Sequence, residues 1–412
     1  MTGSNLSMKK RMHVTVTSIG LVFLLAIGNL SKASGQPTPA TRKAANHIEI
    51  LVVGDTLPES PWRGKQDLEH FLDGVKERLG QADVVFANLE GPITQATEPT
   101  PWKNQKALDE GRDYLIRMTD PQIPAALKAA GFTLVGLANN HMMDYQEQGL
   151  FDTIAALDKA ELPYVGAGRN QEEAGKAWIF TKRITTPPVE PSRRGGSGQA
   201  QTPAAEKEIR IAFLAFSDVV PKYAWADPAK PGIATAKEEE RLMDAIREAR
   251  KQADHVVLMM HWGGHALPET IPHQRFLGRL AVRVGADAVV GMHPHVLQGV
   301  EWYRGPRTGL ARAGPIFYSL ANFAYASRQD EARRAAMARL IFDGTGLKSA
   351  GLIPIEISEE GAPKIAQGNG RAEILKVIAE RSAKFRARLR DGEIVILRER
   401  KAAQSNKIEK RK

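Results

Sequence analysis

Short apolar runs alternate along the chain with segments of helical spacing, and this alternation constrains the fold more than any other feature. The runs are rich in β-branched residues, which is typical of buried strands. Strands that alternate with helices predict a mixed α/β protein built in layers. The predicted strands are 48–53, 83–89, 133–137, 164–165, 209–216, 255–260, 288–291, 316–320, 338–342, 352–357 and 393–397, and the predicted helices include 67–79, 121–130, 147–159, 237–252 and 273–284.

A polar cluster follows each of five predicted strands. Ligands of open α/β sheets bind beyond the carboxyl ends of the strands, so this repetition is informative. Taken singly, a Gly-Asp or an Asn-Asn-His is commonly a turn or a cap. Together, the clusters gather so many ionisable groups near one sheet edge that a neutralising partner is expected. The clusters are Gly54-Asp55, Asn88-Leu89-Glu90-Gly91, Ala138-Asn139-Asn140-His141, His261-Trp262-Gly263-Gly264-His265 and Gly291-Met292-His293-Pro294-His295.

These clusters predict a metal centre. The chain has no cysteine, so its ligands must be oxygen and imidazole groups, which suit Mn, Fe, Zn or Mg without separating them. The set is large enough for one or two divalent ions, and paired ions suit hydrolysis or transfer at a charged centre. One carboxylate must bridge a pair of ions, and Glu90 is the best candidate. We expect Asp55 and His295 on one ion, and Asn140, His261 and His293 on the other.

The order of the motifs resembles that of a known family. To the five clusters the chain adds Asp144, Glu301 and the segment Tyr318-Ser319-Leu320-Ala321-Asn322-Phe323. This series is similar to the bacterial CapA family, the capsule-synthesis proteins associated with poly-γ-glutamate. The similarity covers about residues 48–325, and the combination of motifs is highly specific.

The resemblance implies a fold and a set of residue roles. CapA proteins resemble calcineurin-like metallophosphoesterases, which implies a four-layer α-β-β-α sandwich with two central sheets and helices outside. By that likeness His141 falls on the position of the general acid that protonates a leaving group. Asn88, Asp144, His265 and Asn322 are expected to be accessory residues. The metal-ligand positions of the family fall on Asp55, Glu90, Asn140, His261, His293 and His295.

Three positions depart from the pattern of these families. Leu57 stands where metallophosphoesterases usually place a histidine, so the first ion has one ligand fewer. His265 stands where CapA-like proteins tend to carry glutamate, either as an extra ligand or as a solvated imidazole. Ala321 replaces a usual glycine, a conservative change if the backbone there keeps a negative φ.

The two ends of the chain differ in character from its body. Lys9-Lys10-Arg11, an apolar run over 14–27 and small residues near Ala33 predict a signal peptide over 1–33, although a retained membrane anchor is the alternative. Residues 34–46 form a polar leader segment, 47–360 the CapA-like domain, and 361–412 a helix and strand extension with a basic tail. The composition of 186–207 predicts a flexible insertion.

The net charge of the chain and its N-terminal leader indicate which partners the protein binds and where it is located. The formal net charge is +10, but the leader and the tail from 398 to 412 carry nearly all of the excess. The body has no basic face interleaved with aromatic residues, which argues against nucleic acid as a partner. We expect an exported protein that is periplasmic, on the cell surface or membrane-associated. The expected partners are the anionic capsule polymer or its precursor and a membrane-bound polymer synthase or exporter.

Three functions fit these observations. The leading hypothesis is an exported metal-dependent hydrolase or transferase of capsule or poly-γ-glutamate metabolism, which acts at an amide or ester through metal-activated water. The second is a periplasmic phosphoesterase, favoured by the implied fold and opposed by Leu57. The third is a non-enzymatic accessory partner of a capsule polymer synthase or exporter.

Overall fold

Two β-sheets form the centre of the fold. The computed structural model describes residues 46–60, 64–186, 205–305, 312–385 and 387–395, which all belong to one compact unit. Within these residues the larger sheet has ten strands. In spatial order they are β19 (Arg388–Arg390), β20 (Glu393–Val395), β17 (Gly346–Ile357), β16 (Arg334–Asp343), β1 (Ile48–Leu57), β4 (Val84–Leu89), β5 (Leu134–Gly136) and β6 (Tyr164–Val165), with β15 (Asn322–Tyr325) paired to β1 and β18 (Pro363–Ile365) to β17.

The second sheet has six strands among the described residues. In spatial order they are β13 (Val300–Arg304), β14 (Ala313–Phe317), β12 (Ala288–Met292), β11 (His255–His261), β9 (Ala205–Ser217) and β8 (Trp178–Thr186). Two small ribbons complete the strand pairing, β2 (Glu59–Ser60) with β3 (Gly64–Lys65) and β7 (Ala167–Gly168) with β10 (Gly232–Ile233).

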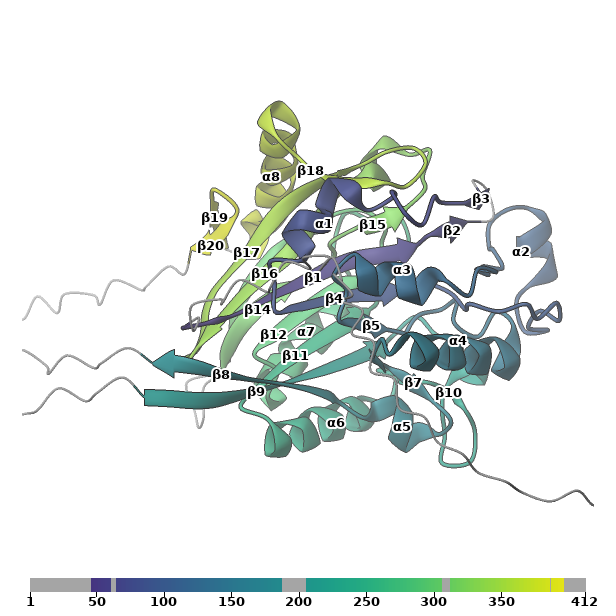
Figure 1. The fold of residues 1–412 in the computed structure, drawn as a ribbon, viewed down its shortest axis with the longest axis horizontal. Helices are drawn as coiled ribbons and strands as arrows, with labels where there is room; N and C mark the ends of the chain where they lie inside the picture. The colour runs from purple at the N-terminus through teal and green to yellow at the C-terminus, as the bar shows by residue number, and fades with distance from the viewer. Residues whose placement is uncertain (1–45, 61–63, 187–204, 306–311, 386, 396–412) are drawn as a thin grey trace, which may run out of the picture. The chain divides into compact units, whose positions relative to one another are not determined.

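The sheets pack face to face, and helices cover their outer faces (Figure 1). Phe86 of β4 meets Phe213 of β9 edge-on, with ring centroids 5.7 Å apart, in the core between the sheets. A second core lies between the six-stranded sheet and the helices α6 (Glu239–Gln252) and α7 (Pro272–Val284). The other helices are α1 (Asp73–Leu79), α2 (Gln105–Asp109), α3 (Ile123–Ala129), α4 (Gln146–Ala160), α5 (Gln171–Gly175) and α8 (Gly368–Ser382).

The central strands have continuous apolar sequences because their successive residues face two different hydrophobic cores. Along β11, Val257 and Met259 enter the core between the sheets, whereas Val256, Leu258 and Met260 enter the core beneath the helices. A strand with helices on one face and a sheet on the other has no solvent-facing side to keep polar. The four-layer α-β-β-α order implied by the sequence is confirmed.

Several elements differ from the sequence prediction. The helix expected over 67–79 begins only at Asp73, because residues 67–72 form turns that use the Asp67 carbonyl as an acceptor. Strands β8, β13, β15, β18 and β19 were not predicted, nor were the four strands of the two small ribbons. Asp55 lies inside β1, at a bulge in its pairing with β4 and β15, and not after the strand.

The two ends of the predicted insertion over 186–207 are also strand residues. Thr186 of β8 pairs with Ala205 of β9, so the antiparallel ladder includes residues 205–207. The intervening residues 187–204 lie outside the described part of the chain, as do the predicted signal peptide, nearly all of the polar leader and the basic tail. The described part of the predicted extension, 361–395, adds strands to the ten-stranded sheet. None of the described helices has the length and apolar character needed to cross a membrane.

The backbone at Ala321 differs from the sequence expectation. Its φ is +62°, in the left-handed region that favours glycine, so alanine there is not a conservative replacement. The Ala321 carbonyl lies against Gly54, where a Cβ would come 2.1 Å from the oxygen, and it accepts a 3.3 Å hydrogen bond from the Asp55 N–H. The absence of a side chain at residue 54 is what lets β1 approach this turn.

Candidate metal centre

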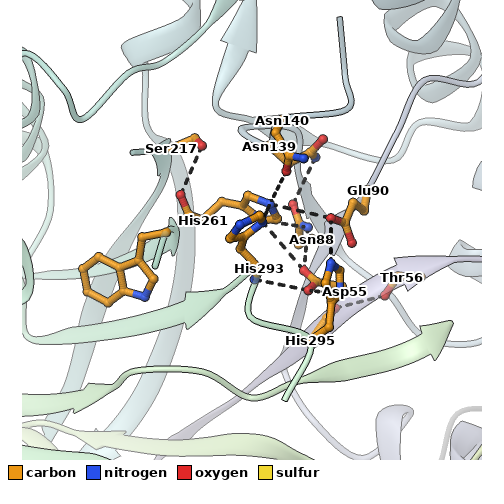
Figure 2. A network of polar contacts seen from close by, with 12 residues as sticks. Asp55, Thr56, Asn88, Glu90, Asn139, Asn140, Ser217, His261, His293 and His295 are labelled. Atoms are coloured by element: carbon orange, nitrogen blue, oxygen red, sulfur yellow. Dashed lines mark hydrogen bonds and ion pairs between the residues drawn. The ribbon is translucent and has the colours of Figure 1, made fainter. Parts of the chain in front are cut away.

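The carboxyl ends of β1, β4, β11 and β12 bring the predicted ligands together (Figure 2). Strands β1 and β4 are parallel neighbours in one sheet, and β11 and β12 are parallel neighbours in the other. Asp55 and Glu90 therefore come from the ten-stranded sheet, and His261, His293 and His295 from the six-stranded sheet. The site lies where these strand ends of the two sheets meet.

Asp55 is buried and held in place by several donors. Its Oδ1 accepts a 2.8 Å hydrogen bond from the Asn88 side chain, and its Oδ2 accepts one of 3.2 Å from the His293 N–H. Its Oδ2 also lies 3.2 Å from the His295 Nδ1. The carboxylate orientation is thus fixed by groups from both sheets.

Glu90 contrasts with Asp55. The side chain is 0% exposed, and neither carboxylate oxygen has a hydrogen-bond partner among the described residues. Oε1 lies 3.6 Å from the Nε2 atoms of both His261 and His295, at ion-pair distance but too far for a hydrogen bond. A buried carboxylate without donors is costly, so its environment is incomplete without a cation.

Two groups of ligand atoms share Glu90. Glu90, His261 and His293 offer atoms that all lie within 4.8 Å of one another, and Asp55, Glu90 and His295 do the same. Asn140 belongs with the first group, because its Oδ1 lies 2.7 Å from His261 Nε2. The structure thus brings together all six predicted ligands, with Glu90 between the two sets.

Burial and mutual charge shift the pKa values of these groups in opposite directions. Burial raises the pKa of Glu90 well above its usual value, and the nearby Asp55 adds to this. Burial and neighbouring imidazoles lower the pKa of His261 and of His293 well below the usual range. Burial also lowers that of His295, but Glu90 and Asp55 outweigh it and raise its pKa to about 10. His261 and His293 are therefore neutral at pH 7, as metal-binding imidazoles must be, whereas His295 is protonated and would release its proton if an ion bound there.

The backbone of the His-Pro-His segment is unusual. His293 has φ +94° and His295 has φ +56°, so both non-glycine residues occupy conformations that L side chains rarely adopt. Such strain is concentrated at functional sites, where the surrounding structure imposes it. Here it lets two imidazoles separated by one residue reach the same centre.

His141 forms a separate buried group beside these ligands. Its Nδ1 lies 2.8 Å from Asp144 Oδ2 and 3.2 Å from the Lys103 amine. Lys103 Nζ also lies 2.9 Å from Asp144 Oδ1, an ion pair without hydrogen-bond alignment. Burial lowers the pKa of His141, although Asp144 opposes this.

Comparison with known proteins identifies the family. The model of the bacterial capsule synthesis protein PGA_cap family matches residues 49–189 and 193–327. The chain belongs to this family. The capsule biosynthesis protein CapA of Bacillus anthracis is 31% identical over 79% of this chain and 71% of its own length, and the PGA biosynthesis protein CapA of Bacillus subtilis is 27% identical over 94% and 91%.

A solved structure shows a weaker likeness. The NAD nucleotidase of Haemophilus influenzae matches with a TM-score of 0.40 and 13% identity, over 80% of this chain and 55% of that chain. The chain thus spans about half the length of that nucleotidase.

The accessory residues differ in their distance from the ligands. Asn88 binds Asp55, and Asn322 Oδ1 lies 2.8 Å from His295 Nδ1, so both orient ligands. His265 is exposed, with its ring 5.2 Å from that of His295, and belongs to neither ligand group. Leu57 is buried in the hydrophobic core, and its apolar side chain offers no ligand atom.

Sequence reasoning missed three residues at the site. Lys103 was missed because it lies in an irregular segment that no motif marks. Asn139 belongs to the Asn-Asn-His cluster, but no function was predicted for it. Its Nδ2 donates to the Leu89 carbonyl at 2.8 Å and to Asn88 Oδ1 at 3.2 Å. Tyr325 is buried with its ring 5.1 Å from His295, and only its place at the end of the family resemblance hinted at this.

We predict that Lys103→Met destabilises the protein by about 3 kcal/mol, because it leaves the buried Asp144 carboxylate without its cation. Lys106→Met is the matched control, since that side chain is 79% exposed and its amine pairs with Glu110 at 3.9 Å. The control should change stability by less than about 0.5 kcal/mol. Urea denaturation of both variants measures the difference, and equal stabilities would mean that Lys103 holds no structural charge.

Proposed function

We propose that this capsule-synthesis protein is a metal-dependent hydrolase or transferase that acts at amide or ester bonds of an anionic capsule polymer or its precursor. The single observation that carries the proposal is the buried Glu90 carboxylate, which has no hydrogen-bond donor in the described part of the chain and belongs to both groups of candidate ligand atoms. The family membership supports the capsule role, and the site geometry supports the chemistry.

The donor set fits one or two divalent ions. Asp55, Glu90 and His295 would hold one, and Glu90, His261, His293 and Asn140 the other, in a mixed oxygen and imidazole environment. Mn, Zn and Fe suit such ligands. Ions held there would lower the pKa of a bound water and polarise the group under attack.

The protein's own residues would position the reactants and move the proton. Asn88 and Asn322 orient Asp55 and His295 through side-chain hydrogen bonds. His141 would give a proton to the departing group from Nε2, because Nδ1 is engaged by Asp144 and Lys103. Asp144 fixes the imidazole orientation, as a carboxylate does for a catalytic histidine.

A first test concerns the metal itself. We expect the protein purified without chelator to carry bound divalent metal, and His293→Ala combined with His295→Ala to lose it. His70→Ala, a change at a histidine whose side chain is 62% exposed, is the control and should keep the metal. Added Mn²⁺ at about 100 times its Kd should stabilise the stripped protein by about 2.7 kcal/mol. Elemental analysis and thermal melting check both points.

The metal proposal fails under a defined condition. Cells should be grown with added Mn and Zn, so that supply does not limit loading. A wild-type protein that then carries below about a tenth of an equivalent of any divalent metal would exclude the proposed centre, since sites of this ligand type bind transition ions tightly.

A second test separates catalysis from metal binding. His141→Ala should leave metal content unchanged and lower turnover by roughly 10²–10⁴-fold, the usual range for general acid–base catalysis. Asn140→Ala should instead lower metal occupancy, with activity falling in proportion. Turnover is measured on γ-glutamyl peptides, beside a chromogenic phosphodiester that reports phosphoesterase activity.

The two variants also define what would contradict the assignment. If His141 only supports the turn that leads to Asp144, its loss costs stability but leaves activity per folded molecule intact. His141→Gln keeps a polar side chain in the buried site and guards against simple unfolding. Unchanged turnover in both His141 variants ends the catalytic role, whereas activity on the phosphodiester alone would favour a phosphoesterase.

We also propose that the protein acts outside the cytoplasm, in the periplasm, on the cell surface or at the membrane. The support is the leader sequence, with Lys9-Lys10-Arg11 before an apolar run over 14–27. N-terminal sequencing of the exported protein should find a mature end near Ser34. Full-length protein confined to the cytoplasm would refute export, and an intact leader in the membrane fraction would indicate an anchor.

A further inference from the structure

A groove on α7 lies apart from the ligand groups and has no part in the proposed chemistry. Its volume is about 320 Å³, and its lining residues are Pro272, Arg275, Phe276, Arg279, Arg283 and Tyr303. The three arginines are spaced four residues apart, so they lie one above another on a single face of the helix. The groove is therefore a row of guanidinium groups with an aromatic wall.

The charges of this row are unevenly compensated. Arg279 is paired with Glu301, whose two carboxylate oxygens each lie 3.1 Å from its Nε. Arg275 donates only to the Thr270 carbonyl, at 2.6 Å, and to the Thr270 hydroxyl, at 3.2 Å. Arg283 is exposed and has no hydrogen bond or ion pair within the described ranges. Two of the three cations therefore face the groove without a carboxylate partner.

The arrangement indicates the chemistry of a ligand. Arg279 already holds a carboxylate of the chain itself, that of Glu301 on β13, so Arg275 and Arg283 are the guanidinium groups left to a ligand. Guanidinium groups bind carboxylates with both oxygens engaged, and successive turns of one helix face repeat about every 5.4 Å. A recessed row of cations suits a narrow chain with repeated carboxylates better than a flat membrane surface.

We propose that the α7 groove binds the anionic capsule polymer, a chain of carboxylates of the poly-glutamate type. The identity of the polymer rests on the proposed function. The further inference is the place on the protein where that polymer is bound. Carboxylates of the chain bind Arg275 and Arg283, and Phe276, 41% exposed, contacts the apolar part of the chain.

The groove is linked to the metal centre through α7 itself. Gln274 on α7 donates to the Tyr318 carbonyl at 3.1 Å, and the indole of Trp262, next to His261, donates to the same carbonyl at 2.8 Å. The segment between Trp262 and α7 carries His265, whose ring lies beside that of His295. A chain bound along α7 thus lies on the element that follows directly from a ligand segment.

The test is binding of fluorescently labelled poly-γ-glutamate to the full-length protein, followed by anisotropy. Arg275→Gln combined with Arg283→Gln should raise Kd by about tenfold, and added salt should weaken binding of the wild type. The matched control is Arg247→Gln with Lys251→Gln, two exposed cations one turn apart on α6, which should change Kd by less than about twofold. Arg283→Gln alone removes no ion pair among the described residues and should raise Kd about threefold, which keeps the test available if the double variant folds poorly.

The outcomes separate this proposal from the others. Equal effects of the α7 and α6 double variants would overturn it, since binding would then follow net charge alone. Binding to vesicles of phosphatidylserine and phosphatidylcholine that depends on Arg283, with no binding of the polymer, would also overturn it and indicate a membrane surface. Metal content is measured on the same preparations, so a metal-free protein that still binds the polymer through α7 refutes the metal centre and not the groove.

Discussion

The buried charge of Glu90 is the constraint on which the site depends. A carboxylate removed from water needs donors or cations, and the other acidic ligand, Asp55, obtains them from Asn88 and the His293 backbone. Glu90 has no donor among the described residues, and the Nε2 atoms of His261 and of the cationic His295 each lie 3.6 Å from its oxygen, too far for a hydrogen bond. The fold keeps this residue at full burial and leaves its environment to be completed by something outside the chain.

The layered architecture makes that arrangement attainable. Each sheet contributes strands whose carboxyl ends meet at the candidate site. A polar side chain placed at or just after a strand end therefore reaches the site. Acidic ligands come from one sheet and imidazoles from the other, and the packing of Phe86 against Phe213 holds the two sheets in register. Precision at the site thus comes from the core between the sheets.

The sequence predicted the layers and the polar residues that gather at the strand ends, because these depend on patterns that are local in the chain. A buried strand followed by polar residues can be recognised within about ten consecutive residues. The carboxylate, amide and imidazole groups of those residues then indicate the kind of site. The contacts of Lys103 with His141 and Asp144 could not be predicted, because they depend on how an irregular segment folds over the strand ends. The left-handed backbone at Ala321 was missed because its cause is a carbonyl packed against Gly54.

That contact between Gly54 and the Ala321 carbonyl has a consequence for substitutions in this chain. Any side chain at position 54 would collide with the backbone of the turn, 2.1 Å away, although neither residue supplies a ligand atom. Asp55 and Asn322, which follow these two residues, pair directly in adjacent parallel strands. A side chain at position 54 would therefore displace two polar groups at once, the Asp55 carboxylate and the Asn322 amide that contacts His295.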